Sequence, residues 1–168
     1  MSQKVANRTA QYPLVAEFGF SFNDWVIDSV DGAKKTLGST VALADPASAV
    51  SGLTGPVANT VTFDGLALPS GAVIQSGEII VETAYATSTA ATLSLGIAGT
   101  LTGLANAVDL KTAAKTVLTA TGVAALLANA GANLRATLAY TVANATAGKV
   151  RVRVMFTIDG RSQEVVPT

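Results

Sequence analysis

Residues 63–100 constrain the fold of this chain most strongly, because turn signals interrupt the stretch about every ten residues. Pro69-Ser70-Gly71, Ser76-Gly77 and Ser88-Thr89 separate short runs rich in β-branched and aromatic residues. Such spacing is typical of an all-β sandwich or barrel. The pattern predicts strands over 72–74, 78–85 and 92–97, with the chain turning at Ser76-Gly77.

Three further segments alternate with the period of a strand. Over 14–22 the even-numbered residues are apolar or aromatic, and over 149–158 the even-numbered residues are Val, Phe or Ile. Successive side chains of a strand point to opposite faces, so each segment is expected to be half-buried. Residues 133–142 alternate similarly, and we expect them to form a hairpin with 149–158 across a turn at 144–148.

The N-terminal part carries weaker signals. Asp31-Gly32 is a hairpin turn signal between short strands expected at 25–30 and 34–37. Residues 38–58 contain Pro and Gly without a sustained period, so they are expected to form a long loop. Residues 1–13 are polar and are predicted to form an extended arm, which could clasp a neighbour or simply fray.

Helical signals are few. Residues 109–119 are the best helix candidate, with Asp109 as its N-cap, although their threonines lower helix propensity. Residues 101–106 are interpreted as a glycine-containing loop, and 123–132 fit a helical turn or a buried strand equally well. We therefore predict one all-β sandwich domain over 14–168, with at most one short helix.

The chain contains neither cysteine nor histidine. Their absence excludes disulfides, thiolate nucleophiles, thiol–zinc sites and Ser-His-Asp triads. No glycine-rich phosphate-binding motif is present either. We predict that the protein is not an enzyme, with no catalytic, cofactor-binding or metal-binding residues and no cofactor.

Charge is sparse and balanced. Eleven Lys and Arg match 11 Asp and Glu, and charged residues make up 13% of the chain, against about 25% in ordinary proteins. A neutral surface with few charges favours association, so we expect a protein that works in an assembly rather than a soluble monomer with a Ser/Thr-rich surface. The sequence shows no apolar run of membrane-spanning length and no secretory leader, so neither a membrane nor export is expected.

Three residues, two glutamates and a tryptophan, are candidates for a ligand-binding or catalytic site. Glu78 and Glu82 share one strand face, and paired carboxylates can hydrolyse glycosides or bind calcium. No further acid, amide or base lies nearby in sequence, so a solvated strand face is favoured. Trp25, the single tryptophan, could form a ligand platform, but a core or interface anchor is the favoured interpretation.

A row of cations is the other candidate. Lys149, Arg151 and Arg153 point outward from their strand, and Arg135 lies on the strand expected to face them. Positioned cations can bind phosphates. A neutral chain with no aromatic residue in the row instead favours a solvated or salt-bridged face, and no direct nucleic-acid binding is expected.

Several motifs resemble a family of small virion proteins of tailed bacteriophages. They are Leu-Pro-Ser-Gly-Ala-Val-Ile (68–74) leading into Gly-Glu-Ile-Ile-Val-Glu-Thr-Ala-Tyr (77–85), Thr-Ala-Ala-Thr-Leu-Ser-Leu-Gly (89–96), Asp-Leu-Lys (109–111), and the Thr-Ala-Gly-x-Val-x-Val-x-Val pattern (146–154). The resemblance covers about two thirds of the chain, from Phe63 onward. It implies a jelly-roll-like antiparallel β-sandwich, and it supplies no catalytic residues.

The resemblance also implies a function. Such proteins commonly decorate the phage head as cement proteins, bound across capsid subunits as homodimers or homotrimers. The expected partners are therefore the major capsid protein and further copies of the chain. The expected location is the virion head, after synthesis in the host cytoplasm. The alternative is a tail or head-fibre component that binds a host or a carbohydrate.

Overall fold

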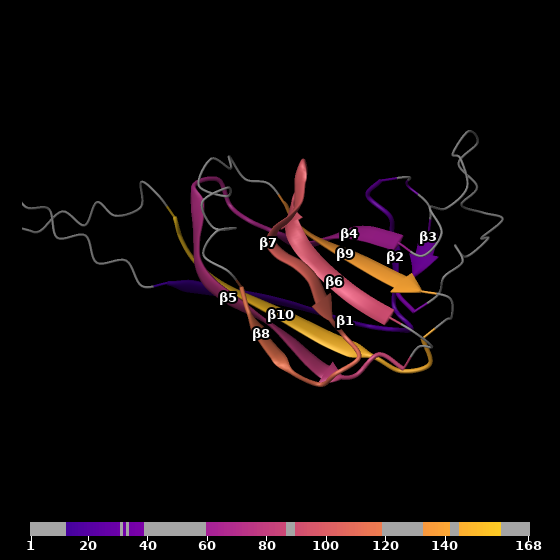
Figure 1. Cartoon of the computed structure of the whole chain (residues 1–168). Helices are drawn as coiled ribbons and strands as arrows, with labels where there is room; N and C mark the ends of the chain where they lie inside the picture. Colours follow the sequence, from indigo (N-terminus) through magenta and orange to yellow (C-terminus); the bar gives the residue numbers. More distant parts are fainter. Residues whose placement is uncertain are drawn as a thin grey trace, which may run out of the picture.

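The computed structural model describes residues 13–30, 32, 34–38, 60–86, 90–118, 133–141 and 145–158. These residues form strands and connecting turns (Figure 1), and no helix among them could cross a membrane. The strands are β1 (Leu14–Ser21), β2 (Trp25–Ile27), β3 (Lys34–Thr36), β4 (Thr60–Ala67), β5 (Ala72–Thr83), β6 (Ala90–Ile97), β7 (Thr100–Asp109), β8 (Lys115–Val117), β9 (Asn133–Thr141) and β10 (Lys149–Ile158).

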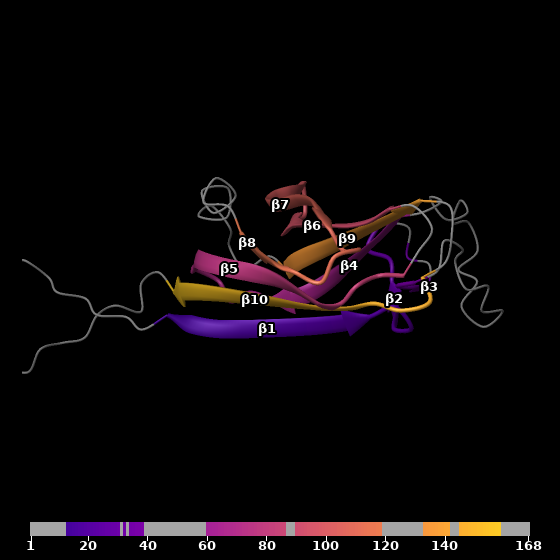
Figure 2. The same ribbon diagram turned by 60° about the horizontal axis from the view of Figure 1, so that its bottom comes forward.

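Two antiparallel four-stranded sheets pack face to face, as Figure 2 shows from the side. One has the order β1-β10-β5-β8 and is called the β10 sheet here. The other has the order β4-β9-β6-β7 and is called the β9 sheet. Strands β2 and β3 form a separate hairpin at one end of the sandwich. The all-β sandwich expected from the sequence is confirmed.

The strand pairing is nested. Apart from the β2–β3 hairpin, the first strand pairs with the last (β1 with β10) and the second with the second-last (β4 with β9). The series continues inward with β5 paired to β8 and β6 paired to β7. The pairs β10–β5 and β9–β6 then join these strands into the two sheets. Rolling such a nested set of pairs into two layers produces a jelly roll, and we interpret the strand order in this way.

The core lies between the sheets and follows the predicted alternation. In β10 the side chains of Val150, Val152 and Val154 are at most 1% exposed, while the intervening Lys149, Arg151 and Arg153 are at least partly exposed. From the β9 sheet, the core receives Val61, Phe63, Ala91, Leu93, Leu95, Leu134, Ala136, Leu138 and Tyr140. The alternation predicted for 14–22, 133–142 and 149–158 is therefore confirmed in β1, β9 and β10.

The predicted turn at Ser76-Gly77 is wrong, because β5 continues through it from Ala72 to Thr83. Gln75 is an extra residue in the ladder: Ile74 pairs with Phe156 and Ser76 with Met155. The resulting bulge accommodates the irregular sequence within one strand. Gly77 serves close packing, since a Cβ atom there would come within 2.8 Å of the Arg153 carbonyl oxygen.

The predicted hairpin between 133–142 and 149–158 is also wrong. Strand β9 lies in one sheet and β10 in the other. The connection, of which residues 145–148 are described, thus crosses between the layers instead of closing a hairpin. Two half-buried strands with equal alternation can face each other across a core as readily as they can pair edge to edge, so alternation alone does not distinguish the two arrangements.

The helix predicted over 109–119 and the loop predicted over 101–106 are wrong within the described residues. Strand β7 covers 100–109, and Lys115–Val117 form β8. The Asp109 carboxylate accepts a hydrogen bond from the Lys111 backbone N–H at 3.0 Å, a local turn rather than a helix cap. The β-branched threonines that lower helix propensity suit strands. Residues 123–132, the arm up to residue 12 and the loop from 39 to 58 lie outside the described residues.

Replacing Val152 with Asp should unfold the sandwich, because an uncompensated charge in the core costs several kcal/mol, a large part of the stability of a typical domain. Met155→Asp is the matched control on the same strand, since Met155 is 38% exposed whereas Val152 is 1% exposed. Circular dichroism and thermal melting should show loss of structure for Val152→Asp alone. Equal melting of the two variants would contradict the assignment of the inner face.

Candidate functional site: the outer face of the β10 sheet

The outer face of the β10 sheet collects most of the charged side chains that the sequence singled out. Strand alternation directs Glu17 of β1, the three cations of β10, and Glu78 and Glu82 of β5 to this face. Register then places Arg153 directly between Glu17 and Glu78. Strand β8 adds Lys115, two positions before Val117, which pairs with Glu78.

These seven side chains form one continuous series of alternating charge, called the ion-pair chain here. It runs Lys115–Glu78–Arg153–Glu17–Arg151–Glu82–Lys149, with N···O distances of 2.5, 3.3, 3.0, 3.5, 2.9 and 2.8 Å in that order. Isolated surface pairs contribute little to stability, but a network shares the entropic cost of ordering its side chains. The chain therefore ties all four strands together across their exposed face.

The charge environment lowers the pKa of two carboxyl groups in this chain. Lys115 hydrogen-bonds Glu78, and with Arg153 nearby the pKa of Glu78 lies below its ordinary value of 4.5. The hydrogen bond from Lys149, followed by the charge of Arg151, does the same for the pKa of Glu82. Both carboxylates are thus held ionised, as an ion-pairing role requires.

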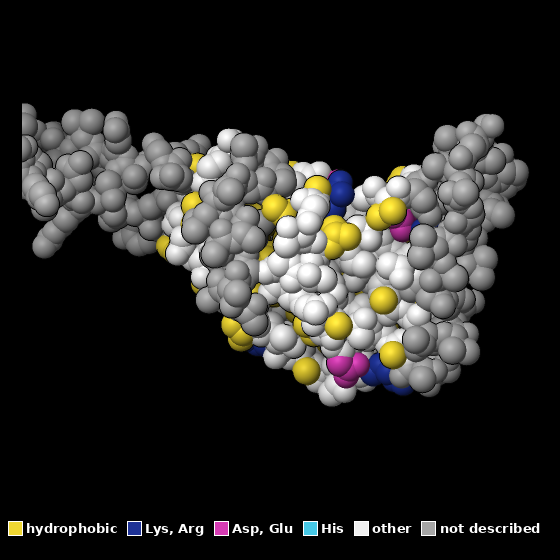
Figure 3. Space-filling view, turned by 45° about the horizontal axis from the view of Figure 1, so that its top comes forward, with side chains coloured by type: hydrophobic (Ala, Val, Ile, Leu, Met, Phe, Trp, Pro, Cys, Tyr) yellow, Lys and Arg dark blue, Asp and Glu magenta, His cyan; other side chains and the backbone are white. Residues whose placement is uncertain are grey.

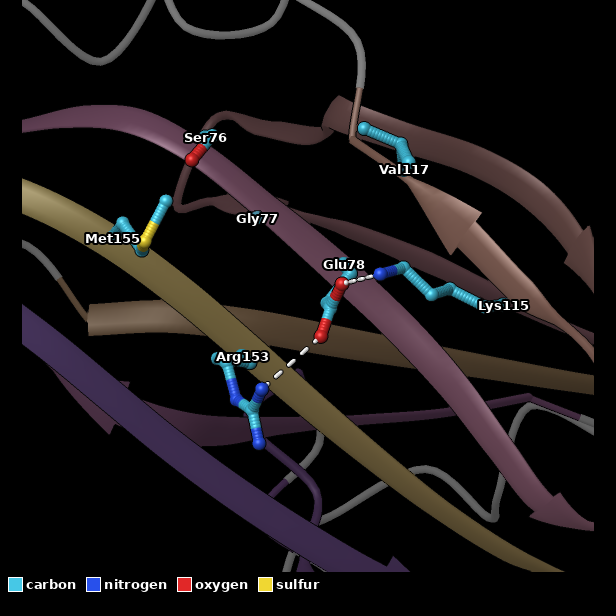
Figure 4. Close-up of a pocket in the computed structure, with 7 residues that line it drawn as sticks. All are labelled: Ser76, Gly77, Glu78, Lys115, Val117, Arg153 and Met155. Atoms are coloured by element: carbon cyan, nitrogen blue, oxygen red, sulfur yellow. Dashed lines mark hydrogen bonds and ion pairs between the residues drawn. The ribbon is translucent and has the colours of Figure 1, made fainter.

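A hollow of about 330 Å³ opens on this face where β8 ends, lined by Ser76, Gly77, Glu78, Lys115, Val117, Arg153 and Met155. Figure 4 shows Glu78 in it, bonded to Lys115 on one side and to Arg153 on the other. Val117 is 64% and Met155 is 38% exposed. The hollow thus combines exposed apolar side chains with one carboxylate, Glu78, that is already paired with two cations.

This geometry decides between the interpretations of the acidic pair. Glu78 and Glu82 lie four positions apart on β5, roughly 13 Å at the rise of a strand. Paired carboxylates in glycosidases lie about 5–9.5 Å apart. Among the described residues, no group of three His, Cys, Asp or Glu side chains could hold a metal ion. The spacing and the bound cations support an ion-pairing role for both carboxylates.

The structure shows what the row of cations on β10 contacts, and it corrects the position expected for Arg135. Lys149, Arg151 and Arg153 each contact a carboxylate, which favours the salt-bridged face over phosphate binding. Arg135 does not face this row, because β9 belongs to the other sheet. Its Nε instead donates to the Asp64 carboxylate at 2.9 Å.

The outer face of the β9 sheet has a different composition. Thr60, Thr62 and Thr137 lie on it, and the hydroxyls of Thr62 and Thr137 are 3.1 Å apart. Its neighbouring strand adds Ala90, Thr92 and Ser94. Figure 3 views the molecule from the side of this sheet and shows few charged atoms among its described residues. This outer face therefore carries the Asp64–Arg135 ion pair among hydroxyl and methyl groups, whereas a continuous series of charges covers the outer face of the β10 sheet.

Trp25 is not a core residue: it is 57% exposed, and Lys34 Nζ lies 4.2 Å from the centre of its ring. Ile27 and Val30 beside it are 51% and 68% exposed. The interpretation of Trp25 as a core anchor is therefore wrong, whereas an interface anchor remains a prediction. The β2–β3 hairpin thus presents an apolar surface that sequence patterning did not reveal.

A buried ion pair fixes this hairpin to the sandwich. Asp28 and Lys35 are each 3% exposed, and their charged atoms lie 2.8 Å apart. Asp28 also accepts a hydrogen bond from the Thr62 backbone N–H at 3.1 Å. No sequence pattern indicated this pair, since a lysine and an aspartate in a short hairpin usually face water.

Comparison with solved structures finds chains of similar fold. No family model and no curated protein matches the chain. A chain of the cyanophage Pam1 capsid asymmetric unit has a similar structure, with a TM-score of 0.54 and 17% identity over 94% of both chains. A chain of the capsid of Ralstonia phage GP4 gives a TM-score of 0.49 and 13% identity, covering 94% of this chain and 91% of that one. At these identities the likeness concerns the fold alone.

The ion-pair chain should make stability depend on pH in the acid range. Because the pKa values of Glu78 and Glu82 are lower in the folded protein than in the unfolded chain, their stabilisation is complete above about pH 4.5 and is lost as the pH falls further. We expect the Tm of a Glu78→Gln/Glu82→Gln variant to fall by a few degrees at pH 7 and to depend less on pH between 6 and 3. Asp109→Asn, which removes a carboxylate outside the chain, is the control. A pH profile identical to that of the parent protein would show that the chain contributes nothing.

Proposed function

We propose that this protein is a structural component of a tailed-phage head, acting as a cement protein that binds across capsid subunits. The observation that carries the proposal is the similarity of its fold, over 94% of both chains, to a chain of the Pam1 capsid asymmetric unit. The motifs of 68–74, 77–85, 89–96 and 146–154 point independently to virion proteins of tailed phages. Neither observation involves catalysis, and the proposed role is non-enzymatic.

The proposed mechanism is the burial of surface on neighbouring subunits. A ligand that binds only the assembled shell stabilises it by mass action, and many copies per shell give weak contacts a large combined effect. The partner is the major capsid protein, and the site of action is the virion, reached after synthesis in the host cytoplasm. The neutral charge and low charged content of 13% suit a chain that is largely covered by neighbours.

One described surface is suited to such contacts. Trp25, Ile27 and Val30 are each more than half exposed, on a hairpin that the buried Asp28–Lys35 pair holds in place. Tryptophan is enriched at the energetic centres of interfaces. The arm of residues 1–13 and the loop of 38–58 are further proposed contact segments.

The exposed Trp25 also favours the second candidate function, a tail or head-fibre component that binds a host or a carbohydrate. Exposed aromatic rings can stack on apolar faces of ligands. In this protein, however, Lys34 already lies over the ring of Trp25. We therefore rank this role below the cement role.

Mixing the purified protein with undecorated phage heads and sedimenting the mixture tests the cement role. We expect saturable co-sedimentation, at a fixed number of copies per head. Trp25→Ala should weaken it, and Val117→Ala, which truncates an equally exposed side chain far from the hairpin, should not. A protein that ignores the heads but binds host-cell envelopes would support the fibre role instead.

Deletion of Ser2 to Ala10 tests the arm. We expect an unchanged circular dichroism spectrum and Tm, because the sandwich begins at Leu14, together with weaker binding to heads. Equal binding of the truncated and the full chain would remove the arm from the proposal.

A further inference from the structure

Four strands lie at the edges of the two sheets: β1 and β8 in one, β4 and β7 in the other. An open strand edge is a template for pairing with another chain, and proteins protect edges by short strands, bulges or coverage. Strand β8 is three residues long, and β7 is interrupted by two register shifts against β6. Both are therefore poor templates.

Strand β4 is protected by coverage. The Ser29 backbone N–H donates to the Thr62 carbonyl oxygen at 2.6 Å, and Asp28 accepts from the Thr62 N–H at 3.1 Å. The end of the β2 segment thus occupies the outward backbone groups in the middle of this edge.

Strand β1 has none of these protections within the described part of the chain. It is eight residues long, and its register with β10 is continuous from Leu14 to Ser21. Figure 2 shows it at the rim of its sheet. Within the described residues, three edges are thus protected by three different devices, and the edge of β1 is left open.

The backbone groups on this open edge can be identified. Phe22 N–H donates to the Gly148 carbonyl oxygen at 3.0 Å, so in an antiparallel ladder the even-numbered residues of β1 bond to β10 and the odd-numbered ones face away. Ser21 is also odd-numbered, but its outward groups are occupied by Asp24. The Ser21 N–H donates to the Asp24 carboxylate at 2.7 Å, and the Ser21 carbonyl oxygen accepts from the Asp24 N–H at 3.1 Å. Val15, Glu17 and Gly19 remain with outward N–H and C=O groups.

We propose that β1 pairs antiparallel with β1 of a second copy of this chain, about a two-fold axis at Phe18, to form a dimer with one continuous sheet across both subunits. The two-fold axis places the partner's Glu17 opposite Gly19. Glu17 and the partner's Gly19 then exchange the outward hydrogen bonds, and the same pair recurs on the other side of the axis. This dimer would be the form that acts in the proposed cement role, but it does not require that role.

Charge and shape favour a second copy as the occupant. Gly19 pairs with Arg151 of β10, so Arg151, Gly19 and the partner's Glu17 fall on one line across the joined sheet. Gly19 has no side chain to separate the two charges, and the Arg151–Glu17 link within the subunit, at 3.5 Å, is the longest of the ion-pair chain. The pairing thus extends the alternation of charge across the dimer.

The neighbouring axis position at Glu17 is less favourable than the axis at Phe18. An axis at Glu17 would place two carboxylates directly opposite each other, which destabilises a strand pair. The axis at Phe18 also places Leu14 and Val15, which are 41% and 59% exposed, opposite the partner's Phe22 and Ser21. Exposed apolar surface at the end of the strand is then covered.

The mass of the purified protein, measured by light scattering during size-exclusion chromatography, tests the dimer. We expect twice the chain mass of 16.9 kDa. Gly19→Pro removes an outward N–H and adds a Cβ atom that would lie 3.3 Å from the Val150 carbonyl oxygen. It should raise the dimer dissociation constant roughly tenfold or more, with an unchanged circular dichroism spectrum. A monomeric parent protein at every accessible concentration would refute the proposal, as would a Gly19→Pro variant that folds and dimerises like the parent.

A matched pair of variants guards against misfolding of Gly19→Pro. Val15→Lys and Val117→Lys place the same charge on exposed valines at opposite edges of the same sheet, 59% and 64% exposed. Only Val15→Lys should weaken the dimer, because lysine discourages pairing at the edge that carries it. Weakening by Val117→Lys instead would assign the interface to β8.

Cross-linking tests the register, and the absence of native cysteine makes it specific. Chains carrying Glu17→Cys are mixed with chains carrying Gly19→Cys and treated with a short thiol-reactive cross-linker. Mixed dimers should be linked far more than dimers of Glu17→Cys alone. The reverse result would overturn the axis at Phe18. Because none of these measurements involves phage heads, failure of the dimer and failure of head binding are distinguished.

Discussion

The pairing of β10 with both β1 and β5 is the constraint on which the β10 sheet depends. Among the described strands, the last, β10, lies between the first, β1, and β5, so this sheet cannot be complete until residues more than a hundred positions apart have come together. The inward valines of β10 fill the centre of the core, and its outward cations bind the carboxylates of both neighbours. One alternating segment therefore supplies the hydrogen bonds, the buried surface and the charges that join three strands.

Local patterning predicted three of the long strands but not their partners. Alternation over 14–22, 133–142 and 149–158 identified β1, β9 and β10 and their inner faces, because burial of one face imposes a period of two. The partners depend on contacts between residues far apart in the sequence. For this reason β9 and β10, which follow each other in the sequence, were predicted to form a hairpin although they lie in different sheets. The turn predicted at Gly77 and the helix predicted near Thr116 were wrong for a related reason. Gly77 is required by its close packing against the Arg153 carbonyl oxygen, and Thr116 lies in a strand because that strand pairs with β5.

The candidate site was predictable as a set of residues and not as an arrangement. The sequence placed Glu78 and Glu82 on one face and Lys149, Arg151 and Arg153 on another strand's outer face, and treated them as separate clusters. Register joins them, and it adds Glu17 from the start of the domain and Lys115 from a segment expected to be helical. It also removes Arg135. The buried Asp28–Lys35 pair carried no signal at all, because its burial arises from the way the hairpin folds against Thr62.

The two outer faces and the edges together suggest how such a chain can associate without precipitating. Each charge of the ion-pair chain has an opposite partner within the subunit, and on the β9 sheet Arg135 is paired with Asp64, so neither face repels a neighbour strongly. A surface of this kind needs control over where association begins. Among the described residues, the edges of β8, β7 and β4 are short, irregular or covered and disfavour pairing. In the proposed dimer, main-chain pairing is therefore confined to β1. In the proposed dimer, selective protection of the other sheet edges directs the association of two copies to the pairing of β1 with β1.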